Sequence, residues 1–75
     1  MTHLEVRYRY ATPPREAEMR ALDAVREVYG VRVLRLNEPE RTILVEYDAS
    51  RLKEPMVAGL LRRAGMDLLE KVAIA

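Results

Sequence analysis

The side chains that could bind a metal ion or take part in catalysis are few in this 75-residue chain, and they do not cluster along it. There is no cysteine, which excludes a thiolate metal site, a disulfide and a cysteine nucleophile. His3 is the sole imidazole, and beside Glu5 on a strand we interpret it as a surface residue. Met1, Met19 and Met56 have no spacing that suits a metal site. We therefore expect a protein that is not an enzyme and that has no cofactor.

The loop at residues 11–18 needs separate consideration, because it leads into a predicted helix. A helix N-terminus offers free N–H groups and a partial positive charge to an anion. Here Pro13 and Pro14 remove two of those donors, and acidic residues follow on the first turn. These residue types suit a structural start, with Thr12 as the cap and the prolines fixing the entry of the helix. We expect a structural loop, and acyl-phosphate hydrolysis, which needs an anion-binding loop, is disfavoured with it.

Hydropathy alternation predicts four strands around this loop. In "HLEVRYRY" (residues 3–10), every second residue is apolar, which is typical of a strand with one buried face. Further strands are predicted at "VRVLRLN" (31–37) and "TILVEYD" (42–48), and the short turn between them favours an antiparallel hairpin. "DLLEKVAIA" (67–75) supplies a last strand through Val72 and Ile74.

Two helices are predicted between the strands. The first lies within residues 14–30 and ends at Gly30, because glycine adopts the left-handed conformation easily. Its apolar stripe comprises Ala21, Leu22, Val25, Val28 and Tyr29. The second begins at Pro55 and ends at Gly65. Its inward residues are Val57, Leu60, Leu61 and Ala64.

The order β-α-β-β-α-β predicts one ferredoxin-like α+β domain over residues 1–75, with two helices on one face of a four-stranded antiparallel sheet. The other face then has no covering element. With the apolar positions turned toward the helices, the open face carries charged residues and a small apolar patch. The residues expected there are His3, Glu5, Arg7, Arg9, Val33, Arg35, Leu44 and Leu69.

Residues 30–67, "GVRVLRLNEPERTILVEYDASRLKEPMVAGLLRRAGMD", resemble the second half of a heavy-metal-associated domain. This is the small module of copper chaperones and of the N-terminal repeats of metal-transporting ATPases. The resemblance consists of a helix that ends at "GV", apolar residues spaced as Val31, Leu34 and Leu36, then "VEYD", a loop with serine, a helix and "AG". The first half of the chain matches only in outline.

This resemblance implies where a metal site would lie. In that family two cysteines, spaced Cys-x-x-Cys before the first helix, capture Cu(I) or another soft ion. Counted back from Gly30, their positions fall on Pro14 and Ala17, and a count from the first strand differs by one, so the site maps within residues 11–18. Met66 follows "AG", where the family sets a side chain against this loop, although it fits a core position equally well. No residue in the loop is a soft ligand, so we expect no metal site of the family's kind.

The expected function is that of a non-catalytic module, related to heavy-metal transport domains, that contacts a protein partner or a second copy through the open sheet face. The predicted surface comprises Arg7, Arg9, Val33, Arg35 and Leu44. The alternative is a self-associating or regulatory ferredoxin-like module with no connection to metal.

Binding to nucleic acid is disfavoured by charge and by the predicted strands. Thirteen basic and 12 acidic side chains leave a net charge of only +1. Tyr8 and Tyr10 share the parity of the buried positions, and "TILVEY" lacks the glycine-aromatic signature of RNA-binding modules. No apolar run reaches the roughly 20 residues of a membrane helix, so we expect a cytoplasmic protein. A charged fraction of 33%, with no glutamine and a single asparagine, is typical of a thermophilic source.

Overall fold

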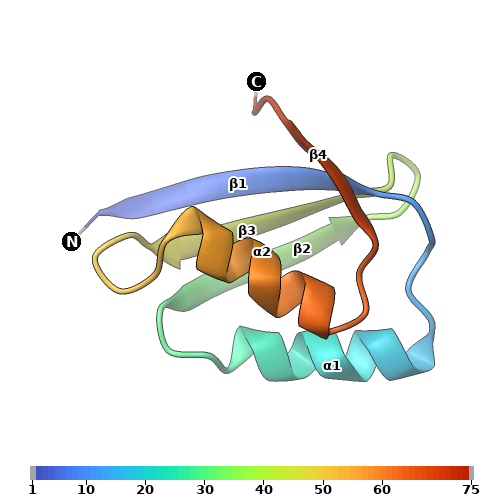
Figure 1. Ribbon diagram of the computed structural model, residues 1–75, viewed down its shortest axis with the longest axis horizontal. Coiled ribbons are helices and arrows are strands. Elements are labelled where there is room, and N and C mark those ends of the chain that lie inside the picture. Colours follow the sequence, from blue (N-terminus) through green and yellow to red (C-terminus); the bar gives the residue numbers. More distant parts are fainter. Residues whose placement is uncertain (1, 75) are drawn as a thin grey trace.

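The computed structural model describes residues 2–74 and has the predicted order of strands and helices (Figure 1). Met1 and Ala75, which the predicted domain includes, lie outside the described residues. The elements are β1 (His3–Tyr10), α1 (Glu16–Arg26), β2 (Val31–Asn37), β3 (Thr42–Asp48), α2 (Glu54–Arg63) and β4 (Leu68–Val72).

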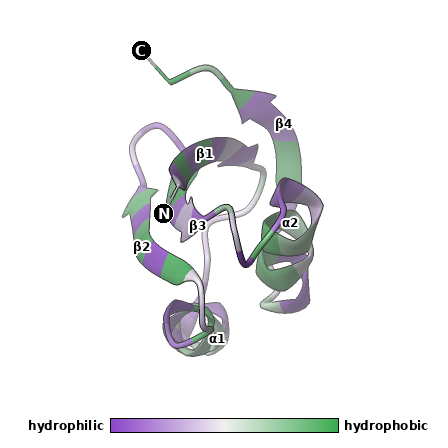
Figure 2. Cartoon of the chain, turned by 90° about the vertical axis from the view of Figure 1, so that its left-hand side faces the viewer, coloured by the Kyte–Doolittle hydropathy of each residue, from purple (hydrophilic) through white to green (hydrophobic). Residues whose placement is uncertain are grey.

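The four strands form one sheet in the order β2-β3-β1-β4, and every neighbouring pair is antiparallel. Both helices lie on the same side of this sheet (Figures 1 and 2). The arrangement is a ferredoxin-like α+β fold, as predicted. β2 and β4 are the edge strands, so the side chains of β3 and β1 form the middle of both sheet faces.

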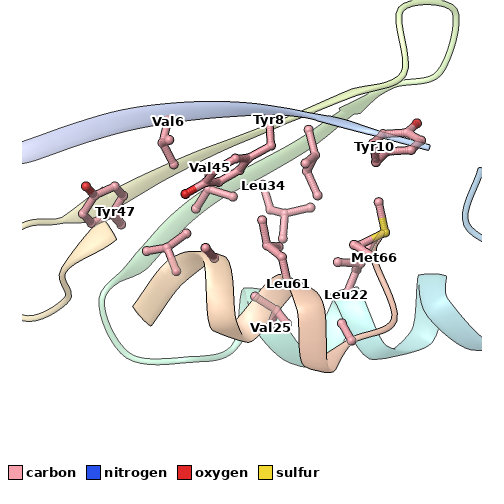
Figure 3. Packing of buried hydrophobic residues seen from close by; sticks show 14 of the residues in the cluster. Val6, Tyr8, Tyr10, Leu22, Val25, Leu34, Val45, Tyr47, Leu61 and Met66 are labelled. Carbon is pink, nitrogen blue, oxygen red and sulfur yellow. The ribbon is translucent and has the colours of Figure 1, made fainter. Parts of the chain in front are cut away.

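The core lies between the sheet and the helices (Figure 3). Alternate residues of β1 and β3 supply the sheet side, including Tyr8 and Val45. Leu22 of α1 and Leu61 of α2 face them and are fully buried. Because strand side chains alternate between the two faces, burial of this set leaves the other set of each strand on the open side.

The first helix begins later than its sequence suggests. Thr12 does not cap it; the N-cap residue is Arg15, whose backbone N–H donates to Glu18 Oε1 at 2.7 Å. Helical conformation is disfavoured for a residue that precedes proline, so Thr12 and Pro13 are kept out of the first turn. Pro55, in contrast, lies within the first turn of α2, as predicted.

The first helix also ends earlier than predicted, at Arg26. Gly30 is left-handed, with φ of 103°, but it lies in the turn before β2 and not at the end of the helix. Tyr29 therefore falls outside the helix and is 72% exposed, so its place in the predicted apolar stripe is wrong. Leu22 and Val25 of that stripe are buried.

β4 is shorter than the predicted strand and ends at Val72, so Ile74 lies beyond it and is exposed. This short strand pairs with β1 only from Arg7 to Tyr10. Leu4 pairs with Tyr47 of β3 but has no β4 residue on its other side, and it is 47% exposed although its parity is that of the core.

Candidate interaction surface on the open sheet face

The strand register arranges the open face in rows that run across the sheet. One row, which we term the central row, places Arg7 opposite Leu44, with Arg35 and then Val72 at the outer strands. The next row toward the start of β1 joins Glu5, Glu46 and Val33, and we term it the acidic row. Side chains directly opposite each other on one face lie about 5 Å apart at Cβ, so neighbouring members of a row are in reach of each other.

Ion pairs use only part of the charge on this face. Arg9 pairs with Glu70 at 3.0 Å, and Arg32 approaches Glu46 at 3.4 Å. Within residues 2–74, Arg7, Arg35 and Glu5 make no ion pair. The central row therefore presents two arginines without carboxylate partners on either side of Leu44.

All five residues of the predicted surface lie on this face. Val33 shares the parity of Arg35 and pairs with Glu46 on the open side, whereas an irregularity between Val31 and Val33 turns Val31 to the core side, opposite Tyr47. Leu44 and Val33 are partly exposed. Their role in binding stays a prediction, while their common placement is a feature of the structure.

The apolar patch differs from the prediction at the β4 side. Val72, and not Leu69, lies in the row of Leu44. Leu69 is 46% exposed and borders a separate hollow together with Arg9 and Arg41. The cause is an irregularity in the β1–β4 pairing between Tyr8 and Tyr10, which no hydropathy pattern reveals.

A shallow hollow of about 790 Å³ extends from the central row around the edge of β2. Arg35 and Leu44 border it on the open side, and Met19 and Leu36 border it on the helix side. A hollow that curves around an exposed sheet edge does not enclose a ligand in the way that a substrate pocket does. It favours contact with a macromolecular surface.

The family resemblance implies a metal site at certain positions, but the residues found there do not fit a soft ion. Pro14 lies before the helix and Ala17 is exposed on its first turn, and neither side chain contains an atom that could bind a metal. Met66 is 3% exposed and packs in the core, where Figure 3 shows it below Tyr10. Within the described chain, no group of three or more His, Cys, Asp or Glu side chains could hold a metal ion.

Two buried tyrosines on the helix side have different polar surroundings. The Tyr8 hydroxyl donates to the Glu54 carboxylate, which also lies 3.7 Å from Lys71 Nζ. Burial is the main cause, and this hydrogen bond the second, that raises the pKa of Tyr8 well above its ordinary value. The Tyr10 hydroxyl is buried without a hydrogen-bond partner among residues 2–74, and burial raises its pKa too. Neither ring is available for stacking on the open face.

A polar corner at the end of β3 was not anticipated from the sequence. Ser50 donates to Asp48 Oδ1 through its hydroxyl at 2.6 Å and its backbone N–H at 3.0 Å, and these bonds lower the pKa of Asp48. Arg51 lies 3.6 Å from Asp48 and stacks on the exposed Tyr29 ring, 4.3 Å from its centroid. The "DASR" sequence is a turn signal, but contact with Tyr29 depends on the early end of α1. The corner orders two turns and lacks a free reactive group.

Comparisons with protein-family models, with curated proteins and with solved structures find no significant match to this chain. No helix in residues 2–74 has the length and apolar character needed to cross a membrane.

Proposed function

We propose that this protein is a non-catalytic binding module that recognises another protein surface through its open sheet face. The observation that supports it is the central row, in which Leu44 lies between two arginines that have no ion-pair partner within the described chain. Arginine next to partly exposed apolar side chains is a common composition for the centre of a protein interface. The burial of Tyr8 and Tyr10 disfavours RNA, because single-stranded recognition relies on exposed aromatic rings.

The proposal includes descent from heavy-metal-associated domains, with the thiolate site missing. Its support is the resemblance of residues 30–67 and the ferredoxin-like fold. Ala11 N–H also donates to the Asp67 carbonyl oxygen at 2.9 Å, so the loop before α1 lies against the segment that follows α2. A module of this kind would contact its protein partner without transferring an ion.

Site-specific photocrosslinking tests the binding proposal. A photoreactive phenylalanine analogue in place of Leu44 should crosslink to protein in a lysate of the source organism or in the purified protein, and Arg35→Glu should lower the yield. The same analogue in place of Ala24, which is exposed on α1, is the matched control. The proposal is wrong if position 44 gives no crosslink under either condition, or gives the same products as position 24.

The relation to metal-binding domains has its own test. Pro14→Cys combined with Ala17→Cys places two thiols at the start of α1, where the helix dipole favours the thiolate. Pro13→Cys with Glu16→Cys controls for the one-residue ambiguity in register. One of the two variants should bind Cu(I) stoichiometrically against a strong chelator. If both fold and neither competes, the loop is no vestigial metal site, and the alternative of an unrelated regulatory module is favoured.

A further inference from the structure

We infer that the open face binds a second copy of this chain, across a two-fold axis that runs perpendicular to the strands between the acidic row and the central row. The inference rests on the proposed function and names its partner. It follows from the order of charges on the face, which is self-complementary under this rotation.

The first step is the spacing of Glu5 and Arg7. They lie two residues apart on β1, on the same face, about 6.7 Å from each other along the strand. Neither has an ion-pair partner in the described chain. A two-fold rotation about an axis midway between them brings Glu5 opposite Arg7 of the second copy, and Arg7 opposite its Glu5. Two identical pairs form, as an isologous interface requires.

The second step concerns like charges inside one copy. Glu5 and Glu46 lie directly opposite each other in the β1–β3 pairing, an arrangement that is unfavourable on an exposed sheet face. Arg32, whose Nε lies 3.4 Å from Glu46 Oε1, offsets this repulsion only in part. The rotation places Glu46 opposite Leu44 of the second copy, between its Arg7 and Arg35. Each unpaired arginine of the central row then approaches a carboxylate of the acidic row.

The overall charge of the face favours a second copy over an acidic or a basic partner. The charged residues presented on it are Arg7, Arg9, Arg32 and Arg35, together with Glu5, Glu46 and Glu70. Four positive and three negative side chains nearly balance, so neither an acidic peptide nor a polyanion has complementary charge across the whole face. A surface with both signs in adjacent rows has complementary charge in a copy of itself.

The small size of the face sets the expected affinity. Four strands about 4.8 Å apart and four rows about 6.7 Å apart span about 500 Å². Standard interfaces bury about 800 Å² on each partner. We expect a reversible dimer with a Kd in the micromolar to millimolar range, weakened by salt because its pairs lie near solvent.

Charge exchange between rows provides the test, by sedimentation equilibrium of the purified chain at about 50 mM NaCl. Arg7→Glu and Glu5→Arg, each alone, place like charges across the axis and should lower dimer affinity about tenfold or more. An equimolar mixture of the two variants should form a heterodimer, because each Glu then meets an Arg. The double variant Glu5→Arg/Arg7→Glu should dimerise like the wild type.

Arg20→Glu, on the exposed side of α1, is the matched control and should leave dimerisation unchanged. Leu44→Lys should weaken the dimer without unfolding the chain, which circular dichroism would check. A wild-type chain that stays monomeric at millimolar concentration overturns the inference, as does a mixture no more associated than its components. If the wild-type chain is monomeric, a crosslink from position 44 to a different protein would leave the proposed binding function intact.

Discussion

Removing the hydroxyl of Tyr8 should destabilise the protein, whereas removing the hydroxyl of Tyr10 should not. Tyr8 and Tyr10 are 4% and 1% exposed and lie two residues apart on the core side of β1. The Tyr8 hydroxyl donates to the Glu54 carboxylate, whereas the Tyr10 hydroxyl has no partner within the described chain. Tyr8→Phe therefore deletes a hydrogen bond, and Tyr10→Phe deletes a polar atom that is buried without one.

The expected magnitudes follow from these surroundings. A hydrogen bond to a charged group contributes about 1.5–3 kcal/mol. Because the Glu54 side chain is 36% exposed and water replaces part of the lost bond, we expect Tyr8→Phe to lower the free energy of unfolding by about 1–2 kcal/mol. Tyr10→Phe should leave it unchanged or raise it by up to about 1 kcal/mol, since desolvation of the hydroxyl has no compensation.

Urea unfolding of both variants at neutral pH measures the difference, and thermal unfolding should separate them by at least about 4 °C in a domain of this size. Glu54→Ala, alone and combined with Tyr8→Phe, completes a double-mutant cycle that isolates the Tyr8–Glu54 coupling. Equal destabilisation by the two tyrosine variants would refute the reasoning, because it would show that the Tyr10 hydroxyl is hydrogen-bonded in solution.

Three further outcomes are expected. The folded-state pKa of Tyr8 lies above the unfolded value near 10, so its contribution to the free energy of unfolding is complete below about pH 10 and is lost as pH rises through the folded value. Urea unfolding between about pH 9 and 11.5 should show a smaller alkaline loss of stability in Tyr8→Phe than in the wild type. Gly65→Ala should lower the free energy of unfolding by about 1–3 kcal/mol, because φ is 100° and the new Cβ would lie 2.9 Å from Glu18 Cγ. Gly59→Ala lies within α2, and its new Cβ would lie 3.6 Å from the nearest side-chain atom, so it should raise the free energy of unfolding by about 0.5–1 kcal/mol in the same assay. Chelator competition with the untagged protein should show no Cu(I) or Zn(II) binding tighter than about micromolar.

The fold was predictable because each element carries a local signal. Alternation in β1 and in "TILVEYD" fixes which side chains enter the core, and the short "NEPER" turn fixes the β2–β3 hairpin. The end of α1 was not predictable in the same way. Val28 and Tyr29 continue the helical spacing in sequence, but the chain has already turned toward β2. A hydropathy stripe describes one face of a helix and does not determine where the chain must leave it.

The candidate surface was predictable as a set of residues, because the open face follows from parity alone. Its internal order was not. Which residue of β4 lies opposite Arg7 depends on an irregularity between Tyr8 and Tyr10 in the β1–β4 pairing. An irregularity of this kind shifts the register of every residue beyond it. The sequence pattern could not show that Val72 joins the central row.

The order of charges on this face differs from the order expected of a sheet face that is only solvated. A sheet face exposed only to water gains stability when opposite charges occupy opposite positions on neighbouring strands. Here Glu5 lies opposite Glu46, and Arg7 lies opposite Leu44, so the most direct cross-strand pairs are left unmade. Within one copy, Arg32 at 3.4 Å is the ion-pair partner of Glu46, and a positive side chain at position 46 would instead pair directly with Glu5. Under the two-fold arrangement proposed above, a second copy would present the two rows in reverse order, so that the arginines of the central row would meet the carboxylates of the acidic row.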